Sequence, residues 1–118
     1  MGSPVNLKCI YVTDSDRTGR LVVQGRTRLF GVMSAGDTSG GGFVNITLKN
    51  GSSSGDTRLV VPTSHSGFSG AGAKYFGNAP FLDMQSRGIL FEDGIYFTAD
   101  AGIYAASLLV EGGKDNAS

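Results

Sequence analysis

The feature that most constrains this chain is the way its glycines separate short apolar runs. There are 19 glycines among 118 residues, and they cluster between the apolar runs rather than inside them. Glycine adopts the positive φ angles of tight turns without steric cost. The runs are rich in Val, Ile, Phe and Tyr, which favour strands, and no window of a dozen residues shows a convincing helical stripe. The spacing predicts an all-β fold, a compact antiparallel β-sandwich or small barrel of about eight short strands. The expected strands are Leu7–Val12, Arg20–Val23, Arg28–Met33, Val44–Lys49, Arg58–Val61, Gly88–Phe91, Ile95–Thr98 and Ala105–Val110.

Two turn dipeptides predict hairpins. Val44–Lys49 alternates apolar and polar residues, so one face should meet the core and the other water. It leads into Asn50-Gly51, a strong turn signal, and we expect the returning strand to close at Pro62. A second hairpin is expected over Gly88–Thr98, with Asp93-Gly94 in a type I′ turn. In that hairpin, Phe91 would face Tyr96 and Leu90 would face Phe97.

Length and charge narrow the classes of function. A chain of 118 residues supports one core, so we expect a single domain over 1–118 with a polar C-terminal tail at 112–118. Ten basic and ten acidic residues give a formal net charge of zero, which leaves no footprint for nucleic acid or an anionic membrane and favours self-association. The start, Met1–Pro4, has no signal-peptide pattern, so we expect a soluble product without a classical export signal. The single cysteine excludes an intrachain disulfide, and we expect Cys9 to be a buried strand residue.

No catalytic arrangement emerges from the titratable residues. His65 is the only histidine, and its neighbours Ser64 and Ser66 are too close in sequence to point toward it as a nucleophile would. Asp14-Ser15-Asp16 lacks the later ligands of a calcium loop and is interpreted as a polar turn. Glu92 and Asp93 should point to opposite faces and so should not share a proton.

A glycine-rich segment and a group of arginines could suggest binding sites, but neither pattern is specific. Gly70–Lys74 resembles a phosphate loop only superficially, because Tyr75 follows where Ser or Thr is required. Arg17, Arg20, Arg26 and Arg28 could meet an acidic partner or form a solvated strand face. We therefore expect no enzyme activity and no catalytic, cofactor-binding or metal-binding residues.

The longest irregular stretch, Thr63–Asn78, carries aromatic residues on a glycine-rich background. Its Phe68, Tyr75 and Phe76 could pack onto a neighbouring subunit or fold back over the chain's own core.

Three segments together resemble a family: Leu7–Val12, Ile46–Gly51 and Gly88–Tyr96. Their layout is similar to that of small β-rich virion proteins of tailed bacteriophages, particularly marine and cyanobacterial phages. The resemblance implies a virion structural protein made in the host cytoplasm, in many copies and homo-oligomeric, with the major capsid protein or tail proteins as partners. A capsid decoration or cement protein is the leading interpretation. Residues 66–78 and 112–118 have no counterpart in that pattern.

The alternatives are a tail-associated component and a glycan-binding module for host attachment. A sugar site usually stacks the ring on an exposed aromatic side chain. The chain has no tryptophan, so that role would fall to Tyr75, Phe76, Tyr96 or Tyr104.

Overall fold

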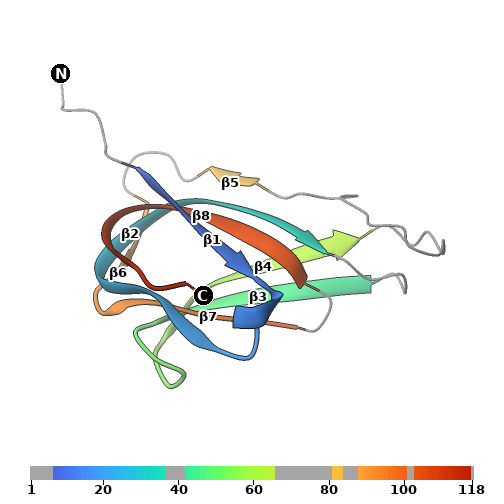
Figure 1. The fold of residues 1–118 in the computed structure, drawn as a ribbon, viewed down its shortest axis with the longest axis horizontal. Coiled ribbons are helices and arrows are strands. Elements are labelled where there is room, and N and C mark those ends of the chain that lie inside the picture. The colour runs from blue at the N-terminus through green and yellow to red at the C-terminus, as the bar shows by residue number, and fades with distance from the viewer. Residues whose placement is uncertain (1–6, 37–41, 66–80, 84–87, 101–102, 118) are drawn as a thin grey trace.

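The computed structural model describes residues 7–36, 42–65, 81–83, 88–100 and 103–117, and its strands form one antiparallel sheet (Figure 1). The all-β prediction is confirmed. The sheet order is β1-β8-β2-β7-β3-β4, and β5 and β6 also pair with β2. The eight strands are β1 (Lys8–Thr13), β2 (Arg20–Gly36), β3 (Gly42–Asn50), β4 (Thr57–His65), β5 (Phe81–Asp83), β6 (Ile89–Phe91), β7 (Gly94–Ala99) and β8 (Ile103–Asp115), and a short 3-10 helix, η1 (Asp14–Asp16), follows β1.

The sheet curls around one core. Ile10 and Val12 of β1, at one margin, belong to the same buried cluster as Val61 of β4, at the other. Phe91 and Phe97 are among the largest side chains in that cluster, and each is fully buried. Full burial of such a side chain contributes about 1.5–3 kcal/mol. Among the described residues β1 and β4 do not pair, so the sheet remains open between them.

β2 is much longer than the sequence suggested. The two separate strands expected at Arg20–Val23 and Arg28–Met33 are one strand of 17 residues. The register with β8 shifts between Gln24 and Thr27, and Gly25 has a φ of 85°. An extra residue at such a bulge bends a strand without ending it. The turn-like composition of this segment therefore marks a bend, which Figure 1 shows as the curve within β2 at the left of the view.

The hairpin expected over Gly88–Thr98 is wrong. β6 pairs with β2 through Phe91 opposite Thr27, and β7 continues along the same strand with Gly94 opposite Gln24. The predicted pairs of Phe91 with Tyr96 and of Leu90 with Phe97 therefore do not form, because each of the four faces β2. The turn at Glu92 and Asp93 interrupts one extended path along β2 instead of reversing the chain.

The hairpin at Asn50-Gly51 is confirmed. β3 and β4 pair antiparallel, with Ile46 opposite Val61 and Leu48 opposite Leu59. Ile46 and Leu48 are buried while Asn45 is exposed, as the alternation predicted. The expected stop at Pro62 is wrong, since β4 continues to His65. β4 lies at the margin of the sheet, where a missing backbone N–H is tolerated.

The expected polar tail at 112–118 is largely part of the sheet. β8 continues through Gly112 and Gly113 to Asp115, which lies opposite Val23. Both glycines have positive φ, and a β-carbon at Gly113 would lie 2.3 Å from the hydroxyl oxygen of Thr27. The backbone N–H of Asn116 then donates to the carbonyl of Val22 at 2.8 Å. These contacts fix the end of the chain against β2.

One strand was not anticipated by the sequence pattern, and one irregular segment is described only in part. β5 was not expected, and it pairs with β2 through Val32 opposite Leu82. Of the long stretch Thr63–Asn78, residues 63–65 belong to β4 and residues 66–78 lie outside the described residues. In the described part of the chain, no helix has the length and apolarity needed to cross a membrane.

Candidate interaction surface

The outer face of β1, β8 and β2 exposes a group of apolar side chains. Residues opposite each other in paired strands share a face of the sheet. One outer row contains Tyr11, Ser107 and Met33, and the next contains Cys9, Leu109 and Gly31. We call Cys9, Tyr11, Met33 and Leu109 the outer patch. Tyr11 is 54% exposed and Met33 is 49% exposed, although both are large apolar side chains.

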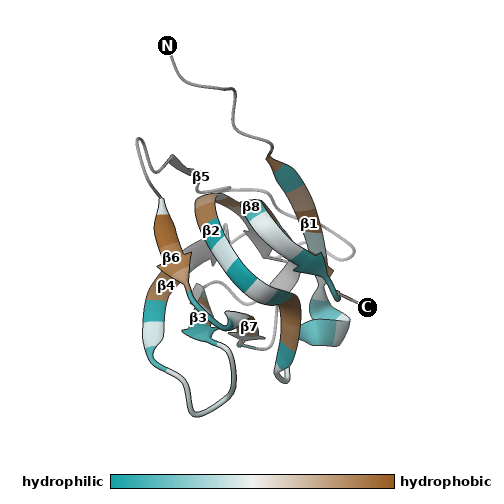
Figure 2. Cartoon of the chain, turned by 90° about the vertical axis from the view of Figure 1, so that its left-hand side faces the viewer, coloured by the Kyte–Doolittle hydropathy of each residue, from teal (hydrophilic) through white to brown (hydrophobic). Residues whose placement is uncertain are grey.

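The outer patch arises because both faces of β1 are apolar. Ile10 and Val12 point inward and are buried, so Cys9 and Tyr11 on the alternate positions point outward. The expectation that Cys9 is buried is therefore wrong: it is a free, exposed cysteine. A strand with one solvated face normally carries polar residues there. Figure 2 shows β1 at the margin of the sheet, beside β8.

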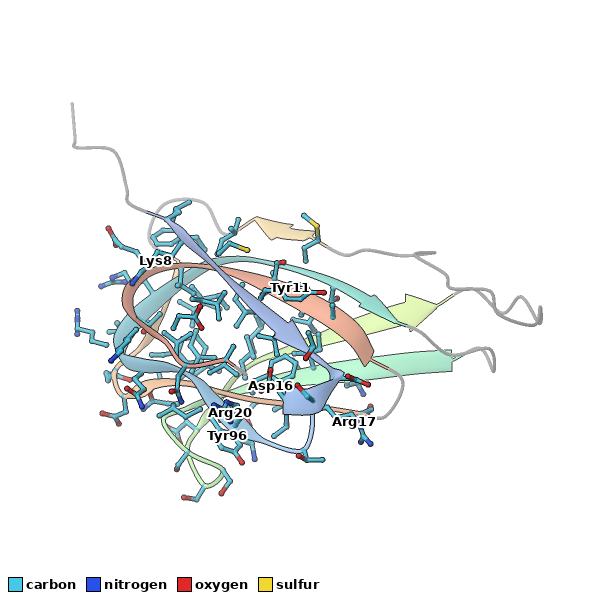
Figure 3. All side chains as sticks on the ribbon, in the orientation of Figure 1. Lys8, Tyr11, Asp16, Arg17, Arg20 and Tyr96 are labelled. Atoms are coloured by element: carbon cyan, nitrogen blue, oxygen red, sulfur yellow. The ribbon has the colours of Figure 1, made fainter. Side chains whose placement is uncertain are left out.

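β1 also has a free edge. It pairs with β8 on one side, and no strand among the described residues pairs with its other side. Such an edge presents backbone donors and acceptors to any extended segment that approaches it. The outer patch and this edge meet at Tyr11, which Figure 3 places on β1.

The polar residues of η1 form a tight structural cluster. The side chain of Asp16 is fully buried, and its Oδ1 atom lies 3.5 Å from Nε of Arg20. The same Nε donates to the carbonyl of Asn116 at 2.8 Å, and Nδ2 of Asn116 donates to the carbonyl of Leu21 at 2.7 Å. Figure 3 shows Asp16 and Arg20 near each other at this corner, with Arg17 on the other side of η1. The polar turn predicted for Asp14–Asp16 is thus a 3-10 turn that joins β1, β2 and the end of β8.

The two turn dipeptides contact each other. Oδ1 of Asn50 accepts a hydrogen bond from the backbone N–H of Asp93 at 2.9 Å, and Nδ2 of Asn50 donates to Oδ2 of Asp93 at 3.2 Å. The N–H of Gly51 donates to the carbonyl of Gly94 at 2.9 Å. Glu92 instead binds Arg58, with 2.8 Å between Oε1 and Nη2. Glu92 and Asp93 therefore have separate partners.

The remaining candidate residues are dispersed. Arg17 directly follows η1 and Arg20 begins β2, whereas Arg26 lies beyond Gly25, in the bulge of β2. Tyr96 is half-buried, with its hydroxyl against Gly19, so little of its ring is free to stack on a sugar. No group of three or more His, Cys, Asp or Glu side chains that could hold a metal occurs in the described part of the chain.

The other candidate side chains lie outside the described residues. The backbones of Ser64, His65 and Tyr104 lie in β4 and β8, but their side chains are outside the described residues. Ser66, Gly70–Lys74 and the aromatic residues Phe68, Tyr75 and Phe76 also lie outside them.

Comparison with protein-family models, with curated proteins and with solved structures found no match.

Proposed function

We propose that this chain is a structural protein of a tailed-bacteriophage virion, a capsid decoration protein that binds the assembled capsid and neighbouring copies through surface complementarity. The observation that carries the proposal is the outer patch, which exposes Tyr11 and Met33 from one row across the sheet, on either side of Ser107. The likeness of Leu7–Val12, Ile46–Gly51 and Gly88–Tyr96 to small phage virion proteins supports the same assignment.

The chemistry of the patch suits binding to another protein surface. Tyr and Met are enriched in the cores of protein interfaces, and charged residues are depleted there. The four residues of the patch carry no charge, and the chain has a formal net charge of zero, so two copies are not driven apart by net charge. The sheet behind the patch is held by Ile10, Leu108 and Val32, all buried, so the surface is fixed before binding.

Many copies on one particle make a weak contact sufficient. When neighbouring copies also touch one another, each binding event raises the effective concentration for the next. A patch of moderate size can therefore hold a decoration protein that is synthesised in the host cytoplasm and assembled on the virion. Its partner on the particle is the major capsid protein.

Mass spectrometry of purified particles tests this assignment first, because a decoration protein must be present in many copies. The second measurement is co-sedimentation of the purified chain with capsids. We expect Met33→Ser to weaken binding about tenfold or more, the effect of losing an apolar interface contact of 1.4 kcal/mol. Val60→Ser is the matched control, because Val60 is 47% exposed and lies on β4, away from the patch.

Absence of the chain from the particle would contradict the proposal, as would equal binding by both variants. Location in the tail, or specific binding on a glycan array without binding to capsids, would instead support one of the two alternatives.

A further inference from the structure

We propose that the free edge of β1 binds the same edge of a second copy, antiparallel, about a two-fold axis that passes beside Tyr11. The inference deepens the proposed function, since it specifies how neighbouring copies touch. The two sheets would become continuous across the pair. The face that carries the outer patch would continue from one copy into the next.

β1 is the margin of the sheet that lacks protection. Natural proteins protect exposed edges with proline, charged residues or bulges. The opposite margin, β4, contains Pro62 and Arg58, and its register with β3 shifts between Leu48 and Lys49. β1 (sequence KCIYVT) contains no proline and no acidic residue, and its register with β8 is uninterrupted from Lys8 to Thr13. Its one charge, on Lys8, lies at the end of the strand.

The faces of the sheet restrict the register of such a pair. Side chains alternate between faces, so buried positions must lie opposite buried positions when the two sheets become continuous. A two-fold axis that passes beside a residue pairs positions that are an even number of residues apart, so the paired side chains lie on the same face. An axis between two residues pairs positions an odd number apart, which lie on opposite faces. The axis can therefore lie beside Cys9, Ile10, Tyr11 or Val12, the interior residues of β1.

Charge complementarity selects Tyr11 from these four, since an axis at Val12 would leave Lys8 beyond the end of the partner's strand, near Asp16, whose side chain is buried against Arg20. With the axis at Tyr11, Lys8 at one end of β1 lies near the partner's Asp14, the first residue of η1 directly after the partner's β1, and this approach occurs twice. An axis at Ile10 would put Lys8 opposite the partner's Val12, and an axis at Cys9 would put it opposite the partner's Ile10. Lys8 and Asp14 are both exposed, and neither makes an ion pair with another described residue. Within the described part of the chain, the ammonium of Lys8 donates to one backbone carbonyl, that of Gly113, at 2.5 Å.

The same register gives matched pairs along the rest of β1. Ile10 lies opposite the partner's Val12 on the core side, which extends the apolar interior from one copy to the next. Tyr11, the most exposed of the large apolar side chains described, lies opposite the partner's Tyr11 on the outer face. Cross-strand aromatic pairs stabilise antiparallel sheets. Because the contact uses the same surface on both copies, it closes as a dimer and does not propagate into a fibre.

The first test is the oligomeric state of the purified full chain by analytical ultracentrifugation. We expect a concentration-dependent dimer. Lys8→Glu places two carboxylates opposite each other at both ends of the contact and should weaken dimerisation about tenfold. The double variant Lys8→Glu, Asp14→Lys restores the opposite charges and should recover the dimer. Circular dichroism of each variant checks that the fold is retained.

The second test reads the register directly by air oxidation. In a Cys9→Ala background, Tyr11→Cys should form a disulfide-linked dimer, and Val60→Cys should not. The native Cys9 should not cross-link, because it would lie four positions from the partner's Cys9, about 13 Å along the strand and beyond disulfide reach.

Three results would overturn the proposal: a monomer at all concentrations, a dimer that the charge substitutions leave unchanged, or a native chain that links readily through Cys9. Each of these measurements uses the purified chain alone, without virions. A failure here therefore leaves capsid binding intact, and a chain that dimerises but never binds capsids contradicts only the proposed function.

Discussion

Replacement of Gly94 by alanine tests whether the segment 89–99 follows β2 or folds back on itself. Gly94 has a φ of 105°, and a β-carbon there would lie 2.3 Å from the carbonyl oxygen of Val23 and 3.2 Å from the nitrogen of Gly25. Both atoms belong to the backbone of β2, so the added methyl group cannot be accommodated by a side-chain rotation. In a free hairpin tip the same methyl group would meet only solvent.

Gly25→Ala is the matched control, because Gly25 also has a positive φ, 85°, but a β-carbon there would meet nothing within 4 Å. A left-handed backbone conformation costs an L-residue about 1–2 kcal/mol. The reduced conformational freedom of the unfolded chain stabilises the alanine variant by about 0.4–1 kcal/mol. Gly25→Ala should therefore lower the free energy of unfolding by about 1 kcal/mol. Gly94→Ala should lose a further ~1–3 kcal/mol, the usual cost of overpacking.

The assay is urea unfolding followed by far-ultraviolet circular dichroism, because the chain has no tryptophan to report by fluorescence. The difference between the two variants is the informative quantity, since backbone strain is common to both. Equal losses would refute the placement of Gly94 against β2 and would favour the hairpin that its dipeptide suggests.

Other substitutions test the contacts that hold the curled sheet, each by the same unfolding assay. Asn50→Ala removes both side-chain hydrogen bonds to the second turn and should cost about 1–2 kcal/mol; no change would mean that the turns are independent. Phe97→Ala opens the core and should cost about 3–5 kcal/mol, whereas Val60→Ala on the outer face should cost under about 1 kcal/mol; similar losses would contradict the assigned faces. Arg20→Ala breaks the contacts to Asp16 and to the chain end and should cost about 1–2 kcal/mol, while Arg26→Ala should be within about 0.5 kcal/mol of wild type; equal effects would show that the η1 cluster contributes nothing.

The strands that the sequence predicted well are those whose local pattern matches their surroundings. Val44–Lys49 alternates strictly, because one face of β3 meets the core and the other does not. Asn50-Gly51 reverses the chain as its composition indicates, with Gly51 at a φ of 80°. At these positions local preference and tertiary structure agree, and the pattern is sufficient.

The lengths of β2 and β8 could not be predicted, because a glycine can reverse, bend or continue a strand. Gln24-Gly25-Arg26 has the composition of a turn, yet it forms a bulge within β2. Gly112 and Gly113 look like a flexible tail, yet they continue β8 against the bent end of the same strand. Asp93-Gly94 has the strongest hairpin signal in the chain, and it joins two segments along one neighbour. Whether a glycine reverses, bends or continues a strand depends on a partner distant in sequence.

The outer patch was missed for a related reason. Leu7, Cys9 and Tyr11 are as apolar as Ile10 and Val12, so the alternation in β1 does not show which set faces the core. The pairing of β1 with β8 decides it, since Leu108 is buried and Leu109 is only partly so. The sequence did contain a signal of a binding surface, since this strand is apolar at both sets of alternate positions. The structure adds that the strand lies at the margin of the sheet.

A cryo-EM reconstruction of the virion tests the central claim of a capsid-binding structural protein most directly. We expect density for this fold on the capsid, with Tyr11 and Met33 of the outer patch facing the capsid surface or a neighbouring copy. Particles without such density, or copies attached through β4 with the outer patch facing solvent, would contradict the claim.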